Sequence, residues 1–119
     1  MHKKNDLFWL VICSTIILFI CSATRHILFQ SNALDLGWFD QGVYQISQGK
    51  PPIISFVGYH ILGDHIAFIL YPIALLYKIY PSVYWLLFLQ AFSLSLAVFP
   101  LWQLAIQAGL KEKIGRAHV

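Results

Sequence analysis

The sequence predicts an all-α protein that crosses a membrane several times, and two observations carry that prediction. Of its 119 residues, 59% are hydrophobic, 16% are aromatic and only 11% are charged, whereas soluble proteins carry about 25% charged residues. The hydrophobic residues also gather in long uncharged runs, and about 20 such residues suffice for a helix that spans the bilayer. The lysines and arginines are scattered rather than gathered on one face, so membrane lipid is an expected partner and nucleic acid is not.

The first span is expected over residues 7–24, directly after Lys3 and Lys4. The positive-inside rule keeps these two lysines in the cytoplasm, which predicts a multi-pass protein of the cell membrane with its N-terminus inside. A signal peptide cleaved after Ala23 is the competing interpretation, because Cys21 and Ala23 are small residues at the required spacing. The length of the hydrophobic run and the spans that follow favour an anchor that is kept.

The more polar residues 25–61 should form an outer loop, since prolines and glycines punctuate them as turn signals. Inside this loop, Leu36, Phe39, Val43 and Ile46 share one face if residues 35–48 are helical. That spacing predicts an amphipathic juxtamembrane helix lying along the membrane surface.

Two further spans complete the expected set of about three. Residues 62–80 form the second, with Asp64 and His65 in its first turn and Lys78 near its cytoplasmic end. Residues 83–105 form the third, which Pro100 should kink because proline breaks the helical hydrogen-bond ladder. This count places Lys111 and Lys113 outside, against the positive-inside rule.

The last six residues, 114–119, are out of keeping with the rest and are expected to be a non-native tail. Residues 1–113 are then expected to be the N-terminal part of a longer membrane domain.

Candidate site residues concentrate in the outer loop. Only five acidic residues occur in the chain, and Asp35 and Asp40 stand close together just beyond the first span. Clustered carboxylates are typical of functional sites. The equal alternative is that Asp35 caps a helix N-terminus and that Asp40 is a solvated residue on a polar face. The residues leave both interpretations open.

Several short strings resemble the start of a prokaryotic family of predicted membrane proteins of unknown function, which is itself similar to the GT-C glycosyltransferases. They are Arg25-His26, Asp35-Leu36-Gly37, Phe39-Asp40-Gln41, Gly63-Asp64-His65 and Gln90-Ala91. The resemblance implies a polytopic helical enzyme whose first outer loop carries catalytic or metal-binding aspartates and whose donor is a polyprenyl-phosphate-linked sugar.

Under that resemblance, Asp35 or Asp40 is the base that takes the proton of the acceptor hydroxyl. The departing phosphate and the substrate would be bound by residues near the membrane boundary, namely Arg25, His26, Gln41, Lys50 and His65. Interfacial snorkelling of Arg25 and Lys50 to lipid headgroups is the equal alternative. Asp64, with His65, is the candidate ligand for a divalent metal, although the sequence leaves the need for any cofactor open.

A transporter component or a non-enzymatic membrane subunit is the alternative from a different functional class. In it, Asp35, Asp40, Asp64 and His65 would line an entry vestibule. A broken helix or a charge near the middle of a span would favour transport, and the third run contains no charged residue.

Overall fold

A computed structural model describes residues 2–64 and 66–109, and the named elements within them are all helices or helical turns. The long elements are α1 (His2–Ile27), α2 (Trp38–Ser47), α3 (Leu70–Ile79), α4 (Tyr84–Leu96) and α5 (Val98–Gln107). A single wide turn, η1 (Ala33–Gly37), precedes α2, and a short 3-10 turn, η2 (Ile61–Gly63), precedes α3. The described residues contain no sheet, only an isolated bridge between Ile53 and His60.

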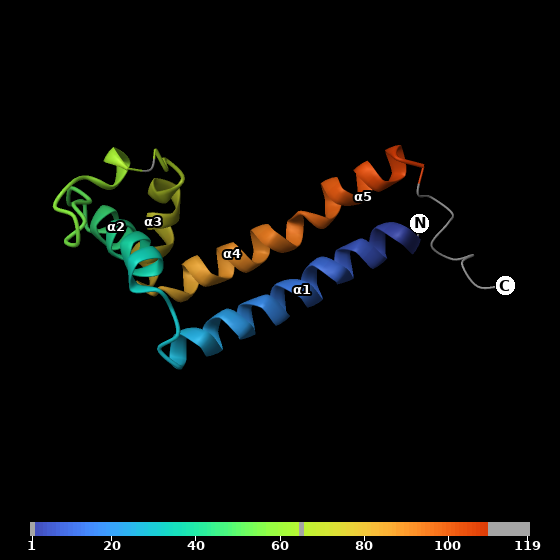
Figure 1. The fold of residues 1–119 in the computed structure, drawn as a ribbon, viewed down its shortest axis with the longest axis horizontal. Helices are drawn as coiled ribbons and strands as arrows, with labels where there is room; N and C mark the ends of the chain where they lie inside the picture. The colour runs from blue at the N-terminus through green and yellow to red at the C-terminus, as the bar shows by residue number, and fades with distance from the viewer. Residues whose placement is uncertain (1, 65, 110–119) are drawn as a thin grey trace.

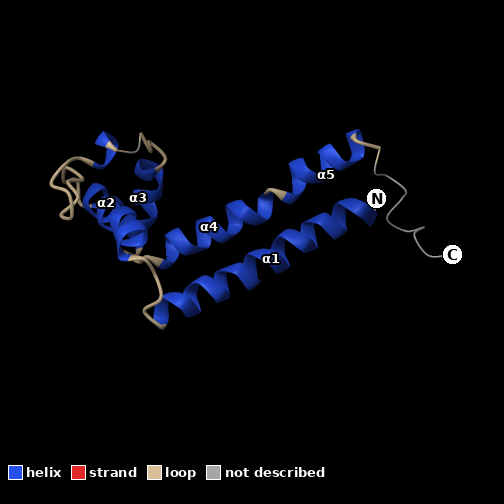
Figure 2. Cartoon of the chain, viewed as in Figure 1, coloured by secondary structure: helices blue, strands red, loops and turns tan. Residues whose placement is uncertain are grey.

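The molecule is a long helical hairpin with a small unit at one end. Helix α1 runs out, and α4 followed by α5 runs back beside it, so that the start of α1 and the end of α5 lie at the same end (Figure 1). Helices α2 and α3, with the loops around them, lie at the opposite end (Figure 2). The overall extents are 62 × 30 × 25 Å.

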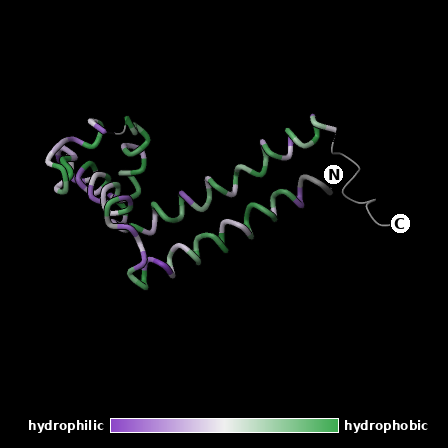
Figure 3. The backbone as a smooth tube through the Cα atoms, in the orientation of Figure 1, coloured by the Kyte–Doolittle hydropathy of each residue, from purple (hydrophilic) through white to green (hydrophobic). Residues whose placement is uncertain are grey.

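The two arms of the hairpin are the helices long and apolar enough to cross a membrane, namely Asn5–Ile27 and Tyr84–Gln107. Hydrophobic residues dominate both arms along their length (Figure 3). Only 11% and 17% of the residues in their apolar windows are buried inside the protein. Most of these side chains therefore face outward, as helices surrounded by lipid require.

Small residues let the two arms pack closely. Ala91 and Ser95 of α4 are buried, and their spacing of four places both on one helix face. Val11 and Thr15 are the buried residues of α1. Nearer the outer loop, the ring of Phe19 packs edge-on against Tyr84 and Phe88.

The returning arm is interrupted at Ala97, between α4 and α5. The predicted effect of Pro100 is thereby confirmed, because proline has no N–H to bond the carbonyl four residues earlier and its ring crowds that carbonyl. The sequence between Tyr84 and Gln107 contains no charged residue, so this arm itself brings no charge to the break.

The expected second span over residues 62–80 is not confirmed. The helix there covers only Leu70–Ile79, about 15 Å at 1.5 Å per residue, which is half the thickness of the hydrocarbon core. Pro72 is tolerated only in a first turn, which fixes the start. Tyr80 is extended because it precedes Pro81, which fixes the end. Two prolines thus limit α3 to a length that cannot span.

Helices α2 and α3 instead enclose a small core of their own. Its buried residues are Val43, Ile54, Ile61, Leu70, Ala74 and Tyr77. Gly42 allows α2 to approach this core closely, because a Cβ at this position would collide with the end of the Ile61 side chain.

The amphipathic pattern over residues 35–48 correctly predicts a helix, but its apolar face has another partner. Val43 is fully buried, and Phe39 and Ile46 pack against the same core. The face therefore meets α3 and the loop before it, rather than a membrane surface.

Candidate functional site

The site begins where α1 ends, at a turn that reverses the chain beside the apolar hairpin. The N–H of Gln30 bonds the carbonyl of Arg25 at 2.8 Å, and the N–H of Phe29 bonds that of His26 at 3.0 Å. This pair of bonds is the Schellman motif, in which the residue after the helix takes a left-handed conformation and is usually glycine. Here that residue is Phe29, with φ 56°. The turn directs Arg25 and His26 toward the segment that follows.

The wide turn η1 is held by Asn32. Its side-chain oxygen accepts a 3.0 Å hydrogen bond from the N–H of Leu34, and its Nδ2 donates at 2.9 Å to Oδ2 of Asp35. Asn32, rather than Asp35, is thus the capping residue. The carboxylate of Asp35 orients the cap and remains exposed at the surface. Wide turns of this kind occur frequently at functional sites.

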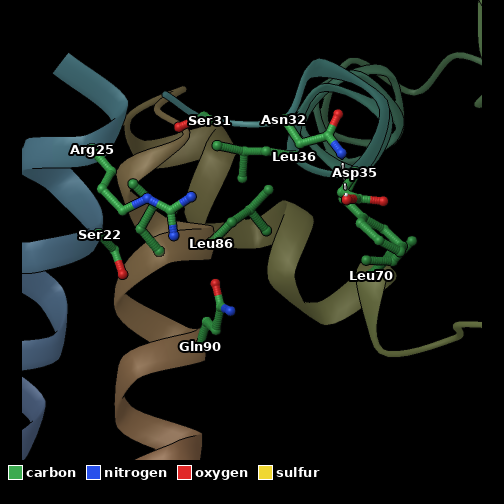
Figure 4. Close-up of a pocket in the computed structure, with 11 residues that line it drawn as sticks. Ser22, Arg25, Ser31, Asn32, Asp35, Leu36, Leu70, Leu86 and Gln90 are labelled. Carbon is green, nitrogen blue, oxygen red and sulfur yellow. Dashed lines mark hydrogen bonds between the residues drawn. The ribbon is translucent and has the colours of Figure 1, made fainter. Parts of the chain in front are cut away.

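A cleft of about 500 Å³ opens between this turn and the two arms. We call it the arginine cleft, and it is lined by Ser22, Arg25, Ser31, Asn32, Asp35, Leu36, Phe39, Leu70, Leu86, Leu87 and Gln90. Arg25 and Ser22 reach in from α1, Gln90 from α4, and Asp35 stands on the opposite side (Figure 4). The cleft therefore has a cation on one side and a carboxylate on the other, with further hydrogen-bonding groups and several leucine side chains around it.

A second cleft, of about 300 Å³, lies on the other side of Leu36. We call it the histidine cleft, and it is lined by His26, Phe29, Ser31, Asn32, Leu36, Gly37, Asp40 and Val83. Nδ1 of His26 lies 3.1 Å from Oγ of Ser31, and the imidazole ring meets Tyr84 edge-on. Ser31, Asn32 and Leu36 line both clefts and so form the partition between them.

Asp40, on the first turn of α2, is fixed by a residue far along the chain. The hydroxyl of Tyr77 donates a 2.6 Å hydrogen bond to Oδ1 of Asp40. Tyr77 is only 2% exposed, whereas Asp40 is half-buried and lines the histidine cleft. A buried phenol thus holds one oxygen of a carboxylate whose side chain borders open space.

The environment of Tyr77 also changes its acidity. Burial raises the pKa of the Tyr77 phenol well above its ordinary value, and the hydrogen bond and negative charge of Asp40 raise it further. Tyr77 lies in α3, outside both long apolar arms. It therefore stays protonated, and remains a hydrogen-bond donor, throughout the physiological pH range.

The other predicted site residues lie apart from these clefts. Oε1 of Gln41 accepts hydrogen bonds from both the N–H and the Oγ of Ser55, at 3.1 and 3.0 Å, so Gln41 ties the following loop to α2. Lys50 is exposed beyond the end of α2, and Asp64 is exposed after η2. Neither lines the arginine cleft or the histidine cleft. Their substrate and metal roles stay predictions.

His65 and the suspected tail 114–119 lie outside the described residues. Within residues 2–64 and 66–109, no three His, Cys, Asp or Glu side chains group closely enough to hold a metal ion. The predicted metal role of Asp64 with His65 therefore remains untested.

Sequence reasoning missed the two residues that hold the aspartates. Asn32 carried a signal, because asparagine three residues before an acid is a pattern of helix starts. No sequence signal pointed to Tyr77. It lies 37 residues from Asp40 in the chain, and an aromatic residue at that position is also expected near a membrane interface. Only the packing of α3 on α2 brings it to the site.

Comparison with known proteins gives one match. No curated protein and no solved structure matches the chain. Residues 25–116 match the model of a family described as predicted membrane protein (DUF2079), and this range includes the end of α1, the returning arm and every lining residue of the two clefts except Ser22. The chain therefore belongs to the DUF2079 family of predicted membrane proteins, whose function is unknown.

Proposed function

We propose that this protein takes part in glycosyl transfer at the outer face of the membrane, with a polyprenyl-phosphate-linked sugar as donor. The observation that carries the proposal is the arginine cleft. It lies at the end of two apolar arms and combines a cation, polar side chains and leucine side chains in one space of about 500 Å³. A lipid-linked phosphate has the same combination of a charged head and a hydrocarbon chain.

Arg25 is the residue for the donor phosphate. A guanidinium binds two phosphate oxygens at once, and Ser22 and Gln90 line the same cleft with further hydrogen-bonding groups. Leu86 and Leu87 offer the apolar surface along which the first isoprene units would lie. Arg25 then stabilises the negative charge that develops as the phosphate departs.

Asp40 is the better placed of the two predicted bases. Tyr77 holds one carboxylate oxygen, and the other is suited to take the proton of an acceptor hydroxyl. The acceptor oxygen then forms a bond to the anomeric carbon while the bond from that carbon to the phosphate oxygen breaks. The bonding electrons leave with the phosphate, and the proton stays on Asp40.

Asp35 receives a different role, because it shares a cleft with Arg25. A carboxylate repels a phosphate but accepts hydrogen bonds from hydroxyl groups. Asn32 fixes its orientation. We assign Asp35 to the hydroxyl groups of the donor sugar, so that loss of Asp35 weakens donor positioning.

The hairpin also favours a definite orientation in the membrane. Two crossings return the chain to the side from which it started, so α1 begins and α5 ends at the same membrane face. Lys3 and Lys4 stand at the start of α1, and Lys111 and Lys113 follow shortly after α5. With the N-terminus in the cytoplasm, all four obey the positive-inside rule, and the conflict that three spans create disappears.

The proposal is tested with the protein encoded by the complete gene, in native membranes supplied with radiolabelled polyprenyl-phosphate hexoses. Transfer of label to a polar or lipid acceptor is expected, and Asp40→Asn should reduce it at least a hundredfold, the usual contribution of a general base. Arg25→Gln should raise the KM for the donor. Lys78→Gln is the matched control, because Lys78 is an exposed cation that lines neither cleft. Full transfer by Asp40→Asn, with normal membrane insertion, would refute the assignment.

A further inference from the structure

Phe29 occupies a backbone position that costs free energy, and no described part of the chain covers its side chain. Its φ of 56° is left-handed, a conformation that glycine adopts freely and that a bulky residue rarely adopts. Its side chain is 96% exposed. The strain is therefore not offset by burial of the ring against the described protein.

Strained residues that persist without a packing reason cluster at ligand sites. Phe29 lines the histidine cleft together with His26 and Asp40. The Schellman turn holds its backbone in place through the bonds that Phe29 and Gln30 make to the last turn of α1. An aromatic ring is thus presented at the rim of a cleft that also contains an imidazole and a carboxylate.

Resting on the function proposed above, we propose that the histidine cleft is the acceptor subsite, that its ligand is a sugar, and that Phe29 is the ring on which that sugar stacks. The C–H face of a pyranose ring is apolar and slightly positive, which matches the negative face of an aromatic ring. The hydroxyl groups around the sugar edge require donors and acceptors, and His26, Asn32 and Asp40 supply both kinds.

The size of the cleft fits one ring. Its volume of about 300 Å³ is at the lower end of the range for ligand pockets. The larger arginine cleft, beyond Leu36, is left for the donor. Leu36 lines both clefts, so an acceptor hydroxyl beside Asp40 and a donor sugar beside Asp35 lie in adjoining spaces.

Binding of a free glycoside tests this subsite without any donor. The protein encoded by the complete gene, in detergent or nanodiscs, is mixed with methyl α-mannoside, methyl β-glucoside or methyl β-galactoside, and saturation-transfer NMR detects contact with the ring protons. We expect a signal from at least one glycoside. Phe29→Leu should reduce it at least fivefold, because leucine is apolar but has no aromatic face, and Phe29→Tyr should preserve it. Phe68→Leu is the matched control, since Phe68 is 64% exposed and lines neither cleft.

Two outcomes overturn the inference. A wild-type signal from Phe29→Leu would mean that Phe29 is an apolar anchor in the lipid interface, and the absence of any signal from the wild-type protein would remove the subsite. Because no donor is present, the result is separate from the transfer assay. Glycoside binding that depends on Phe29, in a protein that transfers no sugar, would leave the subsite standing and refute only the proposed reaction.

Discussion

The hydroxyl of Tyr77 donates a 2.6 Å hydrogen bond to Oδ1 of Asp40, and through it the last turn of α3 fixes the first turn of α2. Tyr77 is buried in the core of this unit, whereas Asp40 faces the histidine cleft. A rigid interior residue thus sets the rotamer of a residue at the surface of a cleft, which is how binding and catalytic side chains are usually positioned.

Replacing Tyr77 by phenylalanine removes this bond while it keeps the ring in the core. A hydrogen bond to a charged group contributes about 1.5–3 kcal/mol to the free energy of unfolding. We expect Tyr77→Phe to lose an amount near the lower end of that range, because Asp40 retains access to water. If Asp40 is the base, kcat should also fall about tenfold, equal to about 1.4 kcal/mol of barrier, with the donor KM unchanged. Thermal unfolding and steady-state kinetics measure the two effects.

Tyr71→Phe is the control for this change. Tyr71 lies on the same helix, is exposed and lines neither cleft, so its phenylalanine variant should keep both stability and kcat. A Tyr77→Phe protein that is less stable but has the kcat of the wild type would show that the bond holds the fold and has no part in positioning the base.

The same pair predicts a loss of stability at alkaline pH. The pKa of Tyr77 is raised in the folded protein, whereas an unfolded tyrosine has a pKa of about 10. Above that pH the unfolded chain releases the Tyr77 proton and the folded chain keeps it, so stability falls as pH rises. Below about pH 9 the contribution is fully present.

Unfolding temperatures measured from pH 8 to pH 11, in wild type and Tyr77→Phe, test this linkage. The difference in unfolding temperature between the two proteins should shrink as pH increases past about 10. The remaining tyrosines and lysines titrate in both proteins and cancel in that difference. A difference that stays constant across the whole range would mean that the Tyr77 phenol ionises alike in the folded and unfolded chains.

Phe29→Gly should stabilise the end of α1. The left-handed conformation costs a residue with a side chain about 1–2 kcal/mol, and glycine avoids that cost but loses more chain entropy on folding. The local free energy of opening should rise by several tenths of a kcal/mol. This gain should appear as slower exchange of the amide hydrogens of residues 29 and 30, which bond the last turn of α1. Phe29→Ala provides the comparison, since alanine keeps the strain and loses the ring. Equal exchange in the glycine and alanine variants would show that the turn carries no strain at this residue.

Local patterns in the sequence predict the parts of this fold that local physics decides. Uncharged runs locate both arms, the spacing of Phe39, Val43 and Ile46 locates α2, and Pro100 locates the break at Ala97. Hydropathy predicts a second span longer than α3, because it does not register that Pro72 and Pro81 limit the length of the helix. The candidate site follows the same division: Arg25, His26, Asp35 and Asp40 are visible from their place beyond the first run, whereas Tyr77 and the partition by Leu36 depend on tertiary packing that no short pattern contains.

The position of Lys78 distinguishes the two-crossing hairpin from three spans. Three spans place Lys78 in the cytoplasm, but α3 is too short to cross, so Lys78 should lie outside together with Gln48 of the α2 end. The test uses single cysteines at positions 48, 78 and 107, in a chain whose Cys13 and Cys21 are replaced by alanine, and a maleimide that does not cross the membrane. On intact cells Gln48→Cys and Lys78→Cys should react, whereas Gln107→Cys should react only after permeabilisation, because α5 ends beside the start of α1. Protection of Lys78→Cys together with labelling of Gln107→Cys on intact cells would show that the chain crosses three times. The two-crossing hairpin would then no longer explain the positions of Lys3, Lys4, Lys111 and Lys113.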